Sequence, residues 1–288
     1  MTQWCQAPLC HNYAMDERTR GILLAKPERI IGFDDDLTAR LRARVGSGNA
    51  ALVEIAGRDS VAAGVLAASS SYDILIPTVV YTGTEYGNWE VVLENTRLLG
   101  DLLRDRAGVD VVEEPVLLGS PRWWHAAGGR FAGVLEERYR FSTTCVACHM
   151  YFHAARVPFA REVGAAAVVA GERLLHGKRL KLNQVGAALD SYIAVLEMAG
   201  IELDLPLKET EDGSHIEELV GPWRESENQM RCVLESNYRD LSGKFGVPEN
   251  DLSAYLEEFL EPVFSRVLLE FNDGGTPDYL AIVDDVLR

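Results

Sequence analysis

Three of the five cysteines in this chain are spaced in a way that suits soft metal ligands. Cys145 and Cys148 form a C-x2-C pair at the expected start of a helix, where the helix dipole favours a thiolate and a metal ion is readily chelated. Cys232 lies far along the chain. Two adjacent thiolates and one distal thiolate could hold an iron–sulfur cluster with one open iron, or Zn²⁺ with one open position. The alternatives are a C-x2-C redox pair and a buried structural Cys232.

The other two cysteines lie near the start of the chain. Cys5 and Cys10 are followed by His11, a spacing that is poor for a metal site. The alternative is an N-terminal arm, residues 1–46, which packs over the core and ends in a short helical pattern.

A second candidate site is the turn between the apolar run 52–55 and the alanine-rich segment 61–68. This pattern predicts a strand, a tight loop and a helix. Such a turn directs backbone N–H groups and the positive end of a helix dipole at one point, where a phosphate can bind. The alternative is an ordinary strand-to-helix turn of a parallel sheet.

The elements that position these residues alternate regularly between strand and helix. Strands are predicted at 51–55, 73–81, 109–117, 165–170 and 201–205, and the longer helices at 85–106 and 184–198. This alternation predicts an α/β fold, a doubly wound five-stranded parallel sheet. In the strand order 3-2-1-4-5, ligands bind outside the carboxyl ends of the first and fourth strands. The turn at 56–60 and the segment at 171–173 would then meet at one crevice.

The turn resembles the Ser-Gly-Gly-x-Asp-Ser signature of the PP-loop ATP pyrophosphatases, with matches at Gly57, Asp59 and Ser60. Ile55 and Ala56 stand where that signature has its first serine and first glycine. The turn is not of the Walker type, because no Gly-Lys-Ser/Thr follows it. The resemblance implies that the loop binds the pyrophosphate part of ATP, and that an adenylated substrate forms as pyrophosphate is released, with AMP as the final product.

The turn, the C-x2-C pair and the distal cysteine together are similar to the tRNA 2-thiocytidine and 2-thiouridine synthetase group of PP-loop proteins. The similarity covers roughly residues 47–235 and does not reach the acidic C-terminus. It implies that Cys145, Cys148 and Cys232 hold a [4Fe-4S] cluster. It also implies that ATP activates a carbonyl of a tRNA base or of a small acceptor, which sulfur from a donor protein then replaces.

The same resemblance implies individual roles. Asp59 and Ser60 would bind pyrophosphate, and Mg²⁺ would bridge Asp59 and the phosphates, because a hard cation prefers oxygen ligands. Basic residues after the fourth strand, among them Arg179 and Lys181, would neutralise triphosphate or contact RNA, although a solvated loop is the alternative. Trp123 and Trp124 could stack a base or belong to the core. The residues expected to bind nucleotide are Ile55, Ala56, Gly57, Arg58, Asp59, Ser60, Thr78, Tyr81, Thr82, Gly171, Glu172, Arg173 and Lys178.

Charge and composition limit the partners. The net charge is -16, and residues 201–288 contain 21 acidic against 7 basic residues, so a small-molecule acceptor competes with tRNA. The composition, the lack of a membrane-spanning run and the lack of a signal-peptide pattern predict a cytoplasmic protein. We expect three regions: the arm at 1–46, a nucleotide-binding α/β domain at 47–207 and an acidic, mainly helical region at 208–288. A homodimer is left open.

Three functions therefore compete. The first is an AMP-forming sulfurtransferase that uses the three-cysteine site. The second is a PP-loop ligase or amidotransferase of the 7-cyano-7-deazaguanine synthase kind, with structural zinc. The third is a nucleotide-binding regulatory module without turnover, suggested by Ile55 and Ala56. Conversion of ATP to AMP separates the third from the others, and the identity of the metal separates the first from the second.

Overall fold

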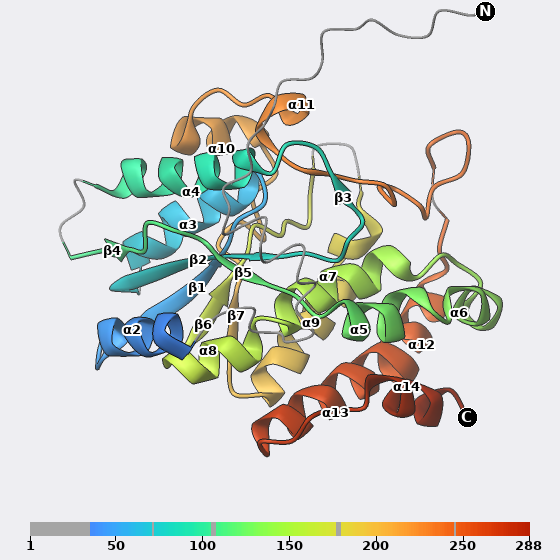
Figure 1. Ribbon diagram of the computed structural model, residues 1–288. Helices are drawn as coiled ribbons and strands as arrows, with labels where there is room; N and C mark the ends of the chain where they lie inside the picture. Colours follow the sequence, from blue (N-terminus) through green and yellow to red (C-terminus); the bar gives the residue numbers. More distant parts are fainter. Residues whose placement is uncertain (1–34, 71, 105–107, 177–179, 245) are drawn as a thin grey trace, which may run out of the picture.

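The computed structural model describes residues 35–70, 72–104, 108–176, 180–244 and 246–288, and a parallel sheet lies at its centre (Figure 1). Its strands are β1 (Ala50–Glu54), β2 (Ile74–Val80), β4 (Asp110–Val111), β5 (Val116–Leu118), β6 (Ala167–Val169) and β7 (Glu202–Asp204). They lie in the order β4-β2-β1-β6-β7, with β5 also paired to β2. The predicted α/β class and strand order 3-2-1-4-5 are therefore confirmed, with β4 and β5 together as the third strand.

The third strand differs from the prediction because it is interrupted between residues 111 and 116. The Val112 amide donates to the Leu75 carbonyl at 3.0 Å, so the odd-numbered residues of β2 direct their backbone groups toward this strand. Pro77 is one of them and has no N–H to contribute. The interruption therefore lies where β2 lacks a donor, and Pro115 also falls within it.

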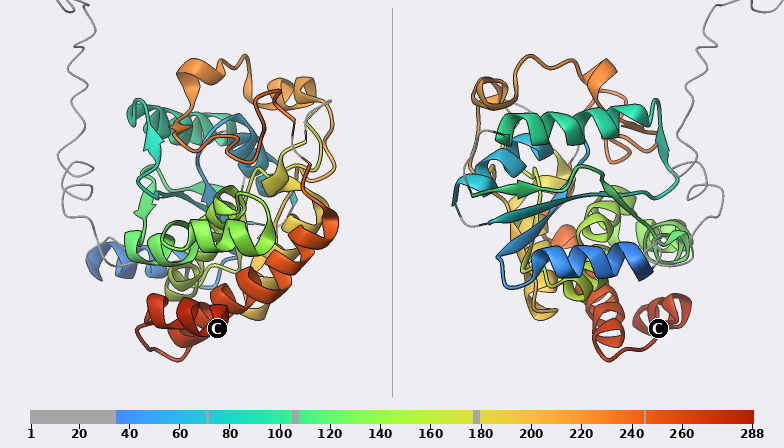
Figure 2. Two further views of the ribbon diagram at one scale, coloured as in Figure 1. Left: turned by 90° about the vertical axis from the view of Figure 1, so that its right-hand side faces the viewer. Right: turned by 60° about the vertical axis from the view of Figure 1, so that its left-hand side comes forward.

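Helices cover both faces of the sheet (Figure 2). One face carries α3 (Arg58–Ser70), α4 (Glu90–Leu103) and α10 (Gly213–Val220), and the other carries α2 (Asp35–Val45), α7 (Thr144–Ala154), α8 (Val157–Val163) and α9 (Gly186–Met198). Alternate residues of β1 point to opposite faces of the sheet. Val53 packs against the first group of helices and Leu52 packs against the second. Because both faces are covered, β1 is apolar along nearly its whole length.

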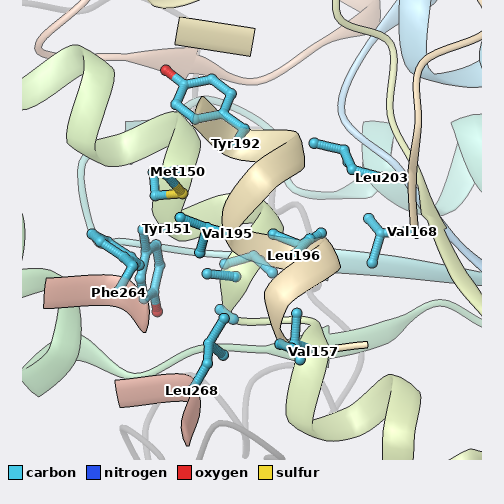
Figure 3. Packing of buried hydrophobic residues seen from close by; sticks show 14 of the residues in the cluster. Met150, Tyr151, Val157, Val168, Tyr192, Val195, Leu196, Leu203, Phe264 and Leu268 are labelled. Atoms are coloured by element: carbon cyan, nitrogen blue, oxygen red, sulfur yellow. The ribbon is translucent and has the colours of Figure 1, made fainter. Parts of the chain in front are cut away.

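The predicted C-terminal helical extension is present. α12 (Glu249–Tyr255) continues through a π-helical turn (Leu256–Leu260) into α13 (Glu261–Asn272), and α14 (Tyr279–Leu287) follows. Phe264 and Leu268 of α13 pack against Tyr151 of α7 and Leu196 of α9 (Figure 3). These helices therefore contribute to the same apolar core as one face of the sheet.

Several short elements complete the fold. α5 (Pro121–Trp124) leads through a π-helical turn (His125–Gly129) to α6 (Ala132–Tyr139), a 3-10 turn lies at Leu182–Gln184, and α11 (Glu225–Asn228) precedes β8. β3 (Glu85–Tyr86) pairs antiparallel with β8 (Arg231–Cys232). The helix predicted over 85–106 therefore begins only at Glu90, because its first residues form a strand. Across the described part of the chain, no helix is both long and apolar enough to span a bilayer.

Candidate active site

One large cleft, of about 1260 Å³, opens where the carboxyl ends of β1 and β6 meet. It is lined by the loop after β1, the segment after β6, the start of α7 and the chain around β8. The crevice predicted from the strand order therefore has its expected position, because parallel strands that pair side by side end at the same edge of the sheet.

The side chain of Ser60 holds the loop after β1 in place through hydrogen bonds to the loop backbone. The Ser60 hydroxyl oxygen accepts from the amides of Ala56 at 2.9 Å and Gly57 at 3.1 Å, and the hydroxyl donates to the Gly57 carbonyl at 2.7 Å. α3 begins directly after the loop, so its N-terminal end faces the cleft together with Ala56 and Gly57. The loop has the form of an anion site, although Ser60 occupies two of its N–H groups.

Gly171 brings the second segment against this loop. A Cβ on Gly171 would lie 2.4 Å from the Asp59 carbonyl carbon and 2.4 Å from the Ser60 amide nitrogen. Both are backbone atoms, so no side chain fits there without moving one of the segments. A Cβ on Gly57 would instead meet the end of the flexible Gln229 side chain at 2.5 Å. The glycine requirement is therefore stricter at Gly171 than at Gly57.

Two arginines hold the Asp59 carboxylate. Arg58 Nε donates to Asp59 Oδ1 at 2.9 Å, and Arg173 Nε donates to Asp59 Oδ2 at 2.8 Å. The Arg173 side chain is only 4% exposed and also donates to the Thr210 carbonyl at 3.2 Å. Both carboxylate oxygens therefore have partners, and Mg²⁺ at Asp59 would have to replace one of these contacts.

His176 continues this network as a neutral imidazole. Its Nδ1 accepts from Arg173 at 3.0 Å, and its Nε2–H donates to the Gln184 side-chain oxygen. Burial, together with the charges of Lys181 and Arg173, lowers the pKa of His176 to about 4. The Gln184 side-chain nitrogen in turn donates to Glu172, so the network reaches the floor of the cleft.

Two histidines flank the buried Glu172 carboxylate. His149 Nδ1 lies 2.6 Å from Glu172 Oε1, and His153 Nε2 lies 3.3 Å from the same oxygen. Burial alone would raise the pKa of Glu172, but the charge and hydrogen bond of His149 and the contact with His153 hold that pKa well below its usual value. Asn183 Nδ2 lies 2.8 Å from His149 Nε2, and Glu54 Oε2 lies 3.6 Å from His153 Nδ1.

The three candidate metal-binding cysteines all line the cleft. Cys145 and Cys148 lie in the first turns of α7, and Cys232 is carried there by the pairing of β8 with β3. Cys232 contacts the Thr84 hydroxyl at 3.3 Å, and Trp124 Nε1 donates to the Cys148 sulfur at 3.4 Å. Residues far apart in sequence are thus brought to one place.

Burial dominates the environment of two of these thiols. It raises the pKa of Cys145 to about 12, with a further contribution from the negative charges of Cys232 and Glu172, and it raises the pKa of Cys148 well above its usual value. In the chain without a bound cation, both thiols are therefore disfavoured as thiolates, and a dipole-favoured thiolate stays a prediction. Thiolates at this site need a nearby cation.

Other residues expected to bind nucleotide lie elsewhere. Thr78 is fully buried within β2, where its hydroxyl donates to the Val53 carbonyl at 3.1 Å and accepts from Arg156 at 2.8 Å. Tyr81 and Thr82 also lie outside the cleft lining. Thr78 lies within β2 and Tyr81 and Thr82 follow its end, whereas the cleft opens at the ends of β1 and β6. Lys178, Arg179, Cys5, Cys10 and His11 fall outside the described residues.

The tryptophan pair belongs to the interior. Trp123 is fully buried and stacks on Tyr279 of α14, with ring centroids 5.7 Å apart and planes 2° apart. Of the two alternatives for Trp123, the structure therefore supports the core position, because its ring is covered by the C-terminal helices. Trp124 is half-buried and faces Cys148.

Three residues of the site were not predicted from the sequence: His149 and Glu54, which line the cleft, and His153, which lies behind them. The two histidines are four residues apart, one helical turn, and this spacing is a signal that could have been used. Glu54 ends the strand before the loop, and only the fold shows that its carboxylate approaches His153.

The fold and the cleft define the class: an α/β protein with a large cleft at the carboxyl edge of a parallel sheet. Within that class, the chain is 31% identical over 238 residues to the uncharacterized protein MJ0009 of Methanocaldococcus jannaschii, a match that covers 82% of this chain and 86% of that one. The chain belongs to the same family as MJ0009. No model of a protein family matches it.

Among solved structures, the chain is similar to a 4-thiouridine synthetase in complex with RNA and bound ATP. The sequence identity is 16% and the TM-score is 0.44, and the match covers 84% of this chain and 54% of that one. The chain thus spans about half the length of that protein.

Proposed function

We propose that this protein is an ATP-binding enzyme of the PP-loop type, which adenylates a substrate, releases pyrophosphate and AMP, and serves sulfur transfer. The observation that carries the proposal is the convergence of two sites in one cleft. The Ala56–Ser60 loop and the three cysteines come from three separate segments of the sequence, and all of them line the same cavity.

The phosphate groups of ATP would bind at the start of α3. The loop N–H groups, the helix dipole and the guanidinium groups of Arg58 and Arg173 lie there. Phosphate oxygens would compete with Asp59 for these arginines, which would free the carboxylate for Mg²⁺. The matches to the PP-loop signature at Gly57, Asp59 and Ser60 support this assignment.

For the three cysteines we propose a [4Fe-4S] cluster in preference to a zinc ion. Zn²⁺ with bonds of about 2.3 Å needs sulfur atoms about 4 Å apart. Among the described residues, the one group of three candidate ligands whose atoms all lie within 4.8 Å of one another contains no cysteine. A cluster binds each cysteine through a different iron and spans a wider gap. When bound by Cys145, Cys148 and Cys232, it supplies one iron that is open to a sulfur ligand.

The charge around the cleft favours a small acceptor over a long stretch of RNA. The described residues that line it include five Lys and Arg side chains and seven Asp and Glu side chains. A nearly balanced surface binds a Mg²⁺-nucleotide and a small carbonyl compound without the excess of cations that a phosphate backbone needs. A single exposed tRNA base remains the alternative acceptor.

One observation favours a second candidate, a nucleotide-binding module without turnover. Ser60 already binds two loop N–H groups, and both oxygens of Asp59 are paired. A loop closed in this way can bind a nucleotide without releasing AMP. Conversion of ATP to AMP by the purified protein separates the two candidates.

The sulfur-transfer part is tested by purifying the protein without oxygen and measuring iron, zinc and acid-labile sulfide. We expect about four iron atoms and four sulfides per chain, and a loss of both in Cys232→Ser. The control is Val233→Ser, at the residue next to Cys232. Val233 is 67% exposed, so this substitution should leave the metal content unchanged. Stoichiometric zinc, or no metal in the wild-type protein, would contradict the cluster.

A further inference from the structure

Two histidines and a glutamate at the floor of the cleft form a ligand set that the sulfur chemistry does not use. His149, His153 and Glu172 each offer one atom, and these atoms all lie within 4.8 Å of one another. His149 and His153 lie one turn apart on α7, and Glu172 lies in the segment after β6. One helix and the segment after one strand therefore bring three metal-ligand atoms close together.

We infer that His149, His153 and Glu172 bind one first-row divalent transition-metal ion, separate from the cysteine site. Metal bonds of about 2.1 Å place ligand atoms about 3.4 Å apart. The 3.3 Å between His153 and Glu172 already matches this spacing. The 2.6 Å hydrogen bond between His149 and Glu172 would lengthen as the metal replaces the shared proton.

The unsatisfied state of His153 supports a ligand at this point. Its side chain is fully buried, and neither ring nitrogen makes a well-formed hydrogen bond with the described residues, although each lies near a carboxylate oxygen. A buried imidazole whose ring nitrogens are poorly satisfied needs an explanation. A metal bound at Nε2 supplies that explanation. Nδ1–H then points toward Glu54 Oε2, 3.6 Å away, an oxygen that also lies 3.5 Å from the Arg156 guanidinium.

The surrounding residues fit the outer shell of a metal site. A ligating histidine usually donates its other N–H to a carboxylate or an oxygen acceptor. Glu54 takes this place for His153, and Asn183 takes it for His149 after a flip of its amide, which exchanges its oxygen and nitrogen. The second oxygen of Glu172 is held by Gln184. Each ligand is therefore oriented by a neighbour.

The donor set indicates which metal fits and how it would be exposed. Two imidazoles and one carboxylate suit Zn²⁺, Fe²⁺ or Co²⁺, and disfavour Mg²⁺, which prefers oxygen ligands. His149 and Glu172 line the cleft, so the ion is reached from the cavity and keeps a position open toward a bound substrate. This inference does not depend on the nucleotide or sulfur chemistry proposed above.

The test uses a Cys145→Ser, Cys148→Ser, Cys232→Ser variant titrated with Co²⁺ under anaerobic conditions. We expect one Co²⁺ per chain, with visible ligand-field bands and without the intense near-ultraviolet bands of cobalt–thiolate bonds. Adding Glu172→Gln should weaken Co²⁺ binding at least tenfold. Adding Glu235→Gln, a carboxylate that lines the cleft but is 63% exposed, should not.

Folding is checked in every variant by circular dichroism, and His149→Ala, at a partly exposed ligand, gives a second test. If the triple serine variant does not fold, the wild-type protein and Glu172→Gln are compared directly, because thiolate bands distinguish cobalt at the cysteines. A folded triple variant that binds no Co²⁺, or an unchanged affinity in folded Glu172→Gln, would overturn the inference. Co²⁺ bound to the wild-type protein that gives only cobalt–thiolate bands would also overturn the inference.

Discussion

At the scale of single residues, the cleft is a continuous network of polar side chains. Glu172 is linked to His149 on one side and, through Gln184 and His176, to Arg173 on the other. Arg173 then reaches the loop at Asp59. A change of charge at one residue therefore acts on neighbours in both candidate sites.

His176 makes a pH dependence testable. Its folded pKa of about 4 lies below the usual value of 6.5, because burial and two nearby cations disfavour the charged ring. As pH falls, the unfolded chain therefore binds a proton before the folded one does. Stability should fall between about pH 6.5 and pH 4, by about 1 kcal/mol after allowing for partial exposure.

Urea denaturation of the wild-type protein and His176→Gln across this pH range measures the effect. The variant should lose the part of the pH dependence that belongs to this side chain. Identical pH profiles for the two proteins would show that His176 has an ordinary pKa in the fold.

At the scale of elements, the β1–α3 loop and the segment after β6 are held together by backbone contact. Gly171→Ala would place a methyl group 2.4 Å from backbone atoms of Asp59 and Ser60. We expect a loss of about 1–3 kcal/mol in the free energy of unfolding, since neither segment can give way as a flexible side chain would.

The matched control is Gly100→Ala in α4, where a Cβ has no neighbour within 4 Å. This change should be neutral or stabilise by up to about 1 kcal/mol, because alanine favours a helix more than glycine does. Equal effects of the two substitutions on the urea midpoint would contradict the close approach of the two segments.

Sequence reasoning predicted the elements that depend on hydrophobic pattern. Strand order and the position of the cleft followed from the alternation of strands and helices. The interruption of the third strand opposite Pro77 could not be predicted in this way, because it depends on which neighbouring strand faces the missing N–H of Pro77. The β3–β8 pair was also missed, because two-residue strands have no periodicity to detect. Glu54 and His153 approach each other only through the packing of α7 on the sheet.

At the scale of the whole molecule, the acidic C-terminal region is part of the main body. Leu256, Phe264 and Val283 lie in the same apolar core as Leu52 of the central strand. The boundary predicted at residue 207 marks a change in composition, and the division of the chain into three regions stays a prediction. The C-terminal helices also cover Trp123, which removes it from the surface available to a substrate.

Binding of ATP at the start of α3 can be measured by titration calorimetry with Mg²⁺-ATP. We expect one ATP per chain for the wild-type protein. Arg173→Gln should weaken binding at least tenfold, about 1.4 kcal/mol, because a buried cation at the phosphate site is lost. The control is Arg224→Gln, whose ion pair with Glu227 is exposed and which should bind ATP as the wild type does. A wild-type protein that binds no ATP, or a folded Arg173→Gln variant with unchanged affinity, would contradict the account.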